Sequence, residues 1–141
     1  MFKLCLEVAN NPDLDPLELA PGWDLVEIPA AKGTIPMSPE EDWEIQKQKL
    51  LSYNLPPMHA SLDWCKWNPC AKTVDWDFFG FWTRRALCRL GEVGVKIIGV
   101  YGGFYKKVED YSSTRQMDQA IQYTNMLGDV ARDYGMMIVL E

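Results

Sequence analysis

A single carboxylate follows the last apolar segment of the chain. Gly135 and Met136 lead into four consecutive apolar residues, Met137 to Leu140, and Glu141 comes directly after them. A buried parallel strand delivers a polar side chain to its carboxyl end in this way, and barrel-type enzymes hold catalytic or metal-binding groups there. Glu141 is therefore the first candidate for a catalytic residue and a metal ligand. The alternative is a solvated carboxylate without a role at a frayed strand end.

Three further polar side chains fall within short alternating segments. Glu7 and Glu27 interrupt apolar runs, and His59, the one histidine of the chain, does the same in a third segment. Carboxylates and an imidazole that meet at the mouth of a barrel are able to contact a polar small-molecule substrate. Two alternatives stay open. Glu7 and Glu27 would otherwise pair with Lys3 or Lys96 as structural charges, and His59 would be a hydrogen-bonded interior residue.

A loop near residue 64 combines aromatic residues with cysteines. Trp64 is a candidate substrate contact because an aromatic ring is able to line a small-molecule pocket; otherwise its cluster belongs to the core or to an oligomer surface. Cys65 and Cys70, with His59 nearby, raise a zinc alternative, but their spacing and the missing fourth ligand argue against it. The aromatic cluster consists of Trp64, Trp67, Trp76, Phe78, Phe79, Phe81 and Trp82.

These candidate residues need strands and helices to position them. Period-two alternation and β-branched runs predict five strands, while capping residues followed by apolar positions at three- and four-residue steps predict four helices. Ser38 and Ser113 are predicted to begin helices in capping boxes with Glu41 and Gln116, and Asp75 to cap another helix. The stretch before Ser38, rich in Ala, Gly and Pro, is expected to be a loop. We expect strands near 2–8, 24–29, 58–63, 95–101 and 136–141, and helices near 10–19, 38–53, 75–94 and 113–134.

The strict alternation of strand and helix predicts parallel strands joined by right-handed crossovers in a single domain over residues 1–141. Two architectures fit this order, an open doubly wound sheet and part of a (β/α)₈ barrel. A nucleotide-binding doubly wound domain would carry glycines after its first strand, but residues 9–12 contain none. Polar residues at several strand ends favour the barrel. The predicted fold class is therefore α/β, a partial (β/α)₈ TIM barrel with about five parallel strands and four helices.

Composition narrows the function classes. The net charge of −6 argues against a nucleic-acid partner, because such binding requires clustered Lys and Arg residues. Neither a secretion signal nor a membrane-length apolar run is present in the sequence, so we expect a soluble, cytoplasmic protein. Four scattered cysteines do not make a disulfide framework; Cys5 and Cys88 fall inside a predicted strand and helix, and free thiols are expected.

Several features combine into a family resemblance. Tyr134 and Gly135 join a long amphipathic helix to a short apolar strand that ends in Glu141. Gly102-Gly103-Phe104 follows the fourth predicted strand, and residues 23–28 place an acidic residue in the second. Together they resemble the xylose-isomerase-like TIM barrel superfamily, which includes the sugar phosphate isomerase/epimerase family. The resemblance covers essentially the whole chain but only the N-terminal half of the family's barrel.

The resemblance implies a role for each candidate residue. Glu141 matches the family's fifth-strand glutamate, which binds a divalent metal (Mn, Mg, Co or Zn) and in the epimerases also moves a proton. A metal that bridges two sugar oxygens stabilises an enediolate while the carboxylate shuttles the proton between carbons. His59 matches the mouth of the third strand, as a metal ligand or substrate contact. Glu27 matches an acid that contacts the substrate, a sugar or polyol.

The resemblance also leaves the site incomplete. The family's other ligands, an Asp, a His and a second Glu from later strands, have no counterpart, and one carboxylate cannot hold a catalytic metal alone. The sequence therefore predicts the N-terminal part of a metal-dependent isomerase or epimerase of the aldose–ketose or ketose epimerase type, inactive by itself. The alternative is a non-catalytic, oligomeric small-molecule-binding or interaction module. Because the first and fifth strands would be open edges, we expect either the remainder of a longer chain or a homo-oligomer.

Overall fold

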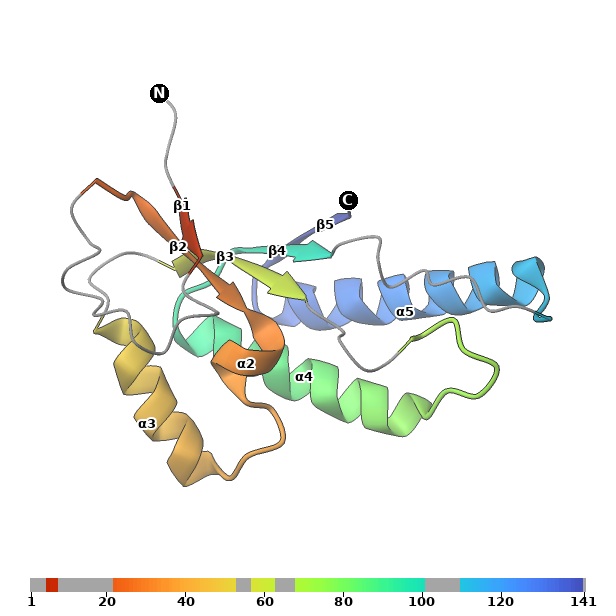
Figure 1. The fold of residues 1–141 in the computed structure, drawn as a ribbon, viewed down its shortest axis with the longest axis horizontal. Helices are drawn as coiled ribbons and strands as arrows, with labels where there is room; N and C mark the ends of the chain where they lie inside the picture. The colour runs from red at the N-terminus through yellow and green to blue at the C-terminus, as the bar shows by residue number, and fades with distance from the viewer. Residues whose placement is uncertain (1–4, 8–21, 53–56, 63–67, 101–109, 141) are drawn as a thin grey trace.

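The computed structural model describes residues 5–7, 22–52, 57–62, 68–100 and 110–140. This part of the chain is an α/β domain in which strands alternate with helices (Figure 1). The strands are β1 (Cys5–Glu7), β2 (Leu25–Pro29), β3 (Pro57–Leu62), β4 (Ile97–Val100) and β5 (Met137–Leu140). The helices are α2 (Ala30–Thr34), α3 (Glu40–Leu51), α4 (Trp76–Glu92) and α5 (Ser113–Asp133).

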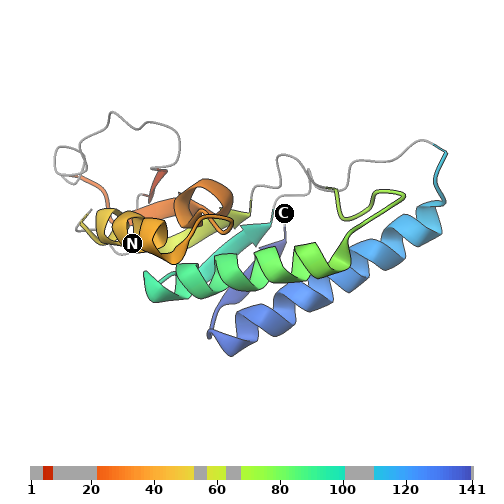
Figure 2. The ribbon, with the colours of Figure 1, turned by 90° about the horizontal axis from the view of Figure 1, so that it is seen from below.

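The five strands form one sheet in the order β1-β2-β3-β4-β5, and every neighbouring pair is parallel. Each new strand is therefore added at the same edge of the sheet, and from β2 onward at least one described helix lies between successive strands, as in a (β/α)₈ barrel. This arrangement confirms the predicted partial barrel and differs from a doubly wound sheet, in which the strand order reverses. The helices α4 and α5 lie side by side along the sheet (Figure 2).

The core lies between the sheet and the helices. One face of each central strand supplies buried apolar side chains, and the helices α4 and α5 supply the other side of the same cluster. Burying this apolar area is the main force that holds the layers together. The strand residues of the cluster are Val26, Ile28, Ala60, Leu62, Ile98 and Val100, and its largest members on α4 and α5 are Phe79, Trp82, Leu87, Leu90, Tyr123 and Leu127.

Helix α2 corrects the expectation of a loop before Ser38. The segment Ala30–Thr34 is helical, with Ala30, Gly33 and Thr34 buried. A five-residue segment with a glycine carries no helical periodicity, so the pattern could not reveal it. Its last carbonyl groups accept hydrogen bonds from Arg89, which lies 55 residues away in the sequence, so the helix depends on a tertiary contact.

Two predicted helix starts also need correction. The Ser38 capping box does not form: Pro39 is the N-cap residue of α3 and makes no side-chain cap. Helix α5 is capped by Ser112, one residue before the predicted Ser113, and the Ser112 hydroxyl accepts from the Arg115 N–H. Asp75 caps α4 as predicted and accepts from the Phe78 N–H at 2.9 Å, a contact that typically stabilises a helix by about 1 kcal/mol.

Three further sequence predictions can be compared with the structure. The helix predicted near residues 10–19 lies outside the described residues. None of the described helices combines the length and the apolar character that a membrane span needs. Cys70 and Cys88 are free thiols, as expected.

Candidate functional site

Three of the predicted site residues occupy one row across neighbouring strands. Glu7 of β1 pairs with Glu27 of β2, and Glu27 pairs in turn with His59 of β3. Neighbouring strands lie about 4.8 Å apart, so the three backbone positions are adjacent. The strand register thus places the backbones of Glu7, Glu27 and His59 side by side, and the roles of the three residues stay predictions.

The position of His59 within its strand differs from the expected one. His59 was expected at the mouth of the third strand, but β3 continues to Leu62 because Ser61 and Leu62 pair with Gly99 and Val100 of β4. His59 therefore lies three residues before the end of its strand. Glu27 similarly lies two residues before the end of β2. Glu27 and His59 thus lie before the carboxyl ends of their strands, whereas Glu7 is the last described residue of β1.

The half-buried Glu27 belongs to the face of the sheet that the helices leave open. Its neighbours Val26 and Ile28 are almost fully buried in the helix-facing core, and successive strand residues point to opposite faces. On β5 the same alternation puts Met137 and Val139 on this open face, where they are 63% and 37% exposed. The open face carries the positions that a closed barrel would turn inward.

Two predicted residues are beyond the reach of the structure. Glu141 and Trp64 lie outside the described residues, so the catalytic and metal-binding role of the first and the substrate contact of the second stay predictions. The apolar run before Glu141 does form a strand, β5, over Met137–Leu140.

A surface pocket of about 450 Å³ lies over the amino-terminal end of α4. Half-buried Phe78 and buried Phe79 line it, so part of the predicted aromatic cluster does face a hollow. Phe79 also packs edge-on against Tyr123 of α5, with ring centroids 5.8 Å apart, while Trp82 is buried and Phe81 is exposed. The cluster is therefore divided between core, pocket and surface. The other residues that line the pocket are Asn68, Ala71, Thr73, Val74 and Asp75.

The described residues do not form a metal site. Within the described ranges, no three His, Cys, Asp or Glu side chains gather in a way that would hold a metal ion. The Cys70 thiol contacts the Gln116 carbonyl oxygen at 3.4 Å, and burial raises the pKa of this thiol. Because zinc binds the thiolate, this environment favours a structural thiol over a zinc ligand.

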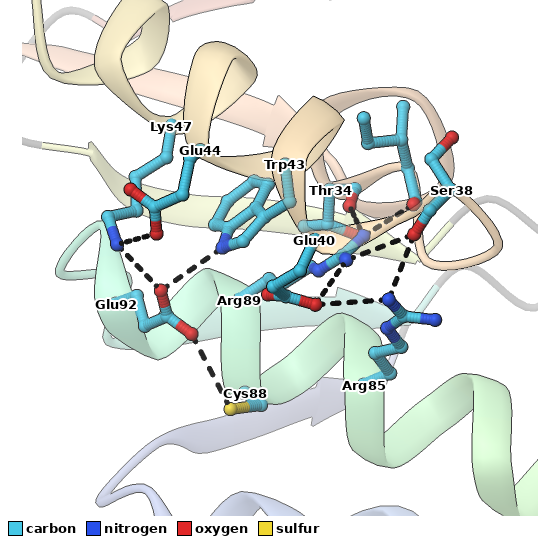
Figure 3. Close-up of polar contacts among 11 residues, drawn as sticks. Thr34, Ser38, Glu40, Trp43, Glu44, Lys47, Arg85, Cys88, Arg89 and Glu92 are labelled. Atoms are coloured by element: carbon cyan, nitrogen blue, oxygen red, sulfur yellow. Dashed lines mark hydrogen bonds and ion pairs between the residues drawn. The ribbon is translucent and has the colours of Figure 1, made fainter.

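The strongest polar cluster of the described residues was missed by the sequence analysis. Arg89 of α4 is only 1% exposed, and its guanidinium donates to the carbonyl oxygens of Thr34 at 2.9 Å and Ser38 at 3.2 Å (Figure 3). It also donates to the Glu40 carboxylate at 2.9 Å and lies 5.2 Å from the centre of the Trp43 ring. The arginine thus ties α2, the following loop and α3 to α4.

Electrostatics fits a structural role for this cluster. Hydrogen bonds from Arg89 and then from Arg85 lower the pKa of Glu40. Beside them, the Glu92 carboxylate accepts from the Trp43 indole N–H at 3.1 Å and from the Lys47 ammonium at 3.0 Å. These groups join helices below β2 and β3 and face away from the row of Glu27. Only the spacing of Arg85 and Arg89 on one helix face signals the cluster in the sequence.

Comparison with solved structures identifies the fold. D-psicose 3-epimerase from Clostridium cellulolyticum H10, in crystals with D-tagatose, is 15% identical with a TM-score of 0.71; the match covers 99% of this chain and 52% of that protein. A xylose isomerase domain protein from Alicyclobacillus acidocaldarius is 14% identical with a TM-score of 0.66, over 98% and 49% of the two chains. The 3-keto-D-glucoside 4-epimerase of E. coli is 20% identical with a TM-score of 0.65, over 98% and 56%.

The chain spans about half the length of these solved structures. Neither a protein-family model nor a curated protein matches the sequence. The structural likeness shows the fold alone, which is that of about half of the TIM barrels of these solved structures. This confirms the resemblance that the sequence suggested.

Proposed function

We propose that the chain is the β1–β5 part of a metal-dependent sugar isomerase or epimerase, and that it is inactive until the remaining strands of the barrel are supplied. The observation that carries this proposal is the fold, because solved ketose epimerases match nearly the whole chain over about half of their own length. Solved structures of D-psicose 3-epimerase were obtained with D-tagatose and in the presence of D-fructose. A ketose is therefore the substrate class to test first.

The strand register supports a polar lining on the open face of the sheet. Glu7, Glu27 and His59 occupy one row, and Ser61 continues the same face of β3 toward the carboxyl edge. In this proposal Glu27 and His59 bind sugar hydroxyl groups, for which a carboxylate and an imidazole are suitable partners. Glu141 takes a proton from one carbon of the ketose as a general base. Delivery of that proton to the neighbouring carbon isomerises the sugar, whereas epimerisation requires a second acid, from the strands that complete the barrel, to protonate the same carbon from the opposite face.

The metal of such enzymes is not accounted for by the described residues. Divalent cations need several oxygen or nitrogen ligands, and the described part of the chain brings no such group together. The residues present therefore do not fit a catalytic metal, and Glu141 by itself would not retain one. In the proposal, the further ligands come from the strands that complete the barrel.

The same observation favours a second candidate, a non-catalytic small-molecule-binding or interaction module on the partial barrel. The described residues supply a fold and a polar row, but they bring no metal site together that would stabilise an enediolate. The two candidates differ in whether activity exists at all, so an assay separates them.

The test is a ketose assay of the polypeptide translated from the complete reading frame that contains this chain. D-tagatose and D-fructose are incubated with and without Mn²⁺, and epimers are resolved by chromatography. We expect Mn²⁺-dependent turnover that Glu141→Gln reduces by about 10²-fold or more, while Glu44→Gln, an exposed carboxylate on α3, changes nothing. Turnover indifferent to Glu141→Gln would refute the assigned role, and no turnover of any ketose would favour the non-catalytic module.

A further inference from the structure

The pocket over the amino-terminal end of α4 lies on the helix side of the sheet. Residues 68–75, which lead into α4, form much of its lining, and Figure 1 shows this segment beside the start of the helix. Phe79, which also lines the pocket, belongs to the core between the sheet and the helices. Glu27 is instead on the open face of the sheet. The proposed function therefore makes no use of this hollow, which we call the α4 pocket.

Contacts with the rest of the chain hold both sides of the α4 pocket. On the loop side, the Ala71 N–H donates to the Asn68 carbonyl at 3.0 Å, and the Ala71 carbonyl accepts from the side-chain amide of Gln119 at 3.0 Å. On the helix side, the Phe79 ring packs against the Tyr123 ring, with centroids 5.8 Å apart. Walls that are already in place lower the cost of ordering a site when a ligand binds.

Most of the lining of the α4 pocket is apolar. Half-buried Phe78 and buried Phe79 provide aromatic surface, and Ala71 and Val74 add aliphatic surface. The volume of about 450 Å³ lies within the range of about 300–1,000 Å³ that is typical of small-molecule sites. The face of an aromatic ring is electron-rich, so it attracts the weakly positive C–H groups on the flat side of a ring-shaped ligand.

Three polar side chains line the same pocket. Thr73 and Asp75 are exposed, and Asn68 is half-buried. A hydroxyl and an amide both donate and accept hydrogen bonds, whereas a carboxylate accepts several. One Asp75 oxygen accepts from the Phe78 N–H at 2.9 Å, which fixes the carboxylate at the start of α4. This mixture of donors and acceptors suits a ligand with several hydroxyl groups, because each hydroxyl both donates and accepts.

The charges around the α4 pocket favour a neutral ligand. Asp75 is the one acidic or basic residue of its lining, so a phosphate or carboxylate would be repelled and would meet no cation there. The first turn of α4 carries the positive end of the helix dipole, which opposes a bound cation. The nearest charged neighbours along the chain, exposed Lys72 and Asp77, have opposite signs.

We propose that the α4 pocket binds a neutral sugar in its ring form, with an apolar side of the sugar against Phe78 and its hydroxyl groups bonded to Thr73 and Asp75. A sugar without a phosphate group combines a flat apolar side, several hydroxyl groups and the absence of charge. The site is additional to the row of Glu27 and His59. It binds the sugar without converting it, because its lining provides one carboxylate and no second group for acid–base catalysis.

The probe for this site is methyl α-D-glucopyranoside, a neutral sugar whose ring is locked and which has no carbonyl group for an isomerase to act on. Titration of the polypeptide from the complete reading frame, followed by ligand-observed NMR, measures the dissociation constant. We expect Phe78→Ala to weaken binding about tenfold and Thr73→Val about threefold to tenfold. Phe81→Ala is the matched control and should leave the dissociation constant unchanged, because Phe81 is on the same helix, is 51% exposed and does not line the pocket.

Further variants separate a binding defect from a folding defect and from binding elsewhere. Phe78→Leu keeps an apolar side chain but removes the aromatic ring, and it should still weaken binding about threefold with a melting temperature equal to that of Phe81→Ala. Glu27→Gln, on the open face, should leave binding of the glycoside unchanged. No binding of the glycoside, affinities that Phe78→Ala and Thr73→Val leave unchanged, or loss of binding in Glu27→Gln would each overturn the proposal. Tighter binding of glucose-6-phosphate or of cyclohexylammonium than of the glycoside would also overturn it, because the pocket would then select a charged ligand.

Discussion

Replacement of Arg89 by methionine should be among the most damaging single substitutions in the domain. Methionine keeps much of the buried length but removes the donors to the carbonyl oxygens of Thr34, Ile35 and Ser38 and to Glu40. Hydrogen bonds from charged groups contribute about 1.5–3 kcal/mol each, and loss of one partner of a buried charged network costs about 3–5 kcal/mol. We expect a loss of about 3–5 kcal/mol in the free energy of unfolding, a large part of the 5–15 kcal/mol typical of a domain.

Urea unfolding followed by tryptophan fluorescence measures this loss, with an unchanged m-value as the sign of an unchanged fold. Arg85→Met is the matched control. Arg85 donates to the same Ser38 carbonyl and Glu40 carboxylate, but its side chain is 28% exposed, so we expect a loss of about 1 kcal/mol or less. A loss below about 1 kcal/mol for Arg89→Met would refute the idea that this arginine holds α2 in place.

Two further predictions concern packing and titration. A Cβ at Gly33 would overlap Cγ2 of Ile28, so Gly33→Ala should destabilise the protein by about 1–3 kcal/mol. A Cβ at Gly80 would meet only Met126 Sδ at 3.8 Å, so Gly80→Ala should stabilise it by about 0.5–1 kcal/mol. Thermal unfolding of the two variants in parallel tests this contrast, and melting temperatures that shift in the same direction would contradict it. Burial raises the pKa of Tyr123 well above its ordinary value near 10. The stabilising contribution of Tyr123 should therefore be fully present below about pH 10, and it should be lost as the pH rises through the raised pKa of the folded state. Tyr123→Phe should flatten that alkaline decrease in urea unfolding, and an identical decrease in the variant would exclude Tyr123 as its source.

The main elements of the fold were predictable from local sequence pattern. Four apolar residues before Glu141 and a β-branched run ending at Val100 indicated strands, and both occur as β5 and β4. The long stripes of α4 and α5 were equally clear because packing against a sheet requires them. Helix α2 was not predictable, since the donors that hold its end belong to Arg89 on a distant helix.

The sequence predicted which strand positions of the candidate site are neighbours, but not how far each residue lies from the carboxyl end of its strand. Parallel alternation was sufficient to bring Glu7, Glu27 and His59 into one row. How far a strand continues beyond a residue depends on its neighbour: β3 extends past His59 because β4 supplies partners for Ser61 and Leu62. Similarly, the expected capping box of Ser38 and Glu41 does not form, and the Ser38 N–H that Glu41 would bind donates to the Ile35 carbonyl at 3.0 Å.

The central claim is that β1–β5 belong to a barrel of the sugar isomerase and epimerase type. It is tested most directly by sequencing the transcript through and beyond the codon for Glu141. We predict further strand–helix repeats that place an Asp, a His and a second Glu at the carboxyl ends of strands. A stop codon immediately after Glu141, or repeats without those three residues, would contradict the claim.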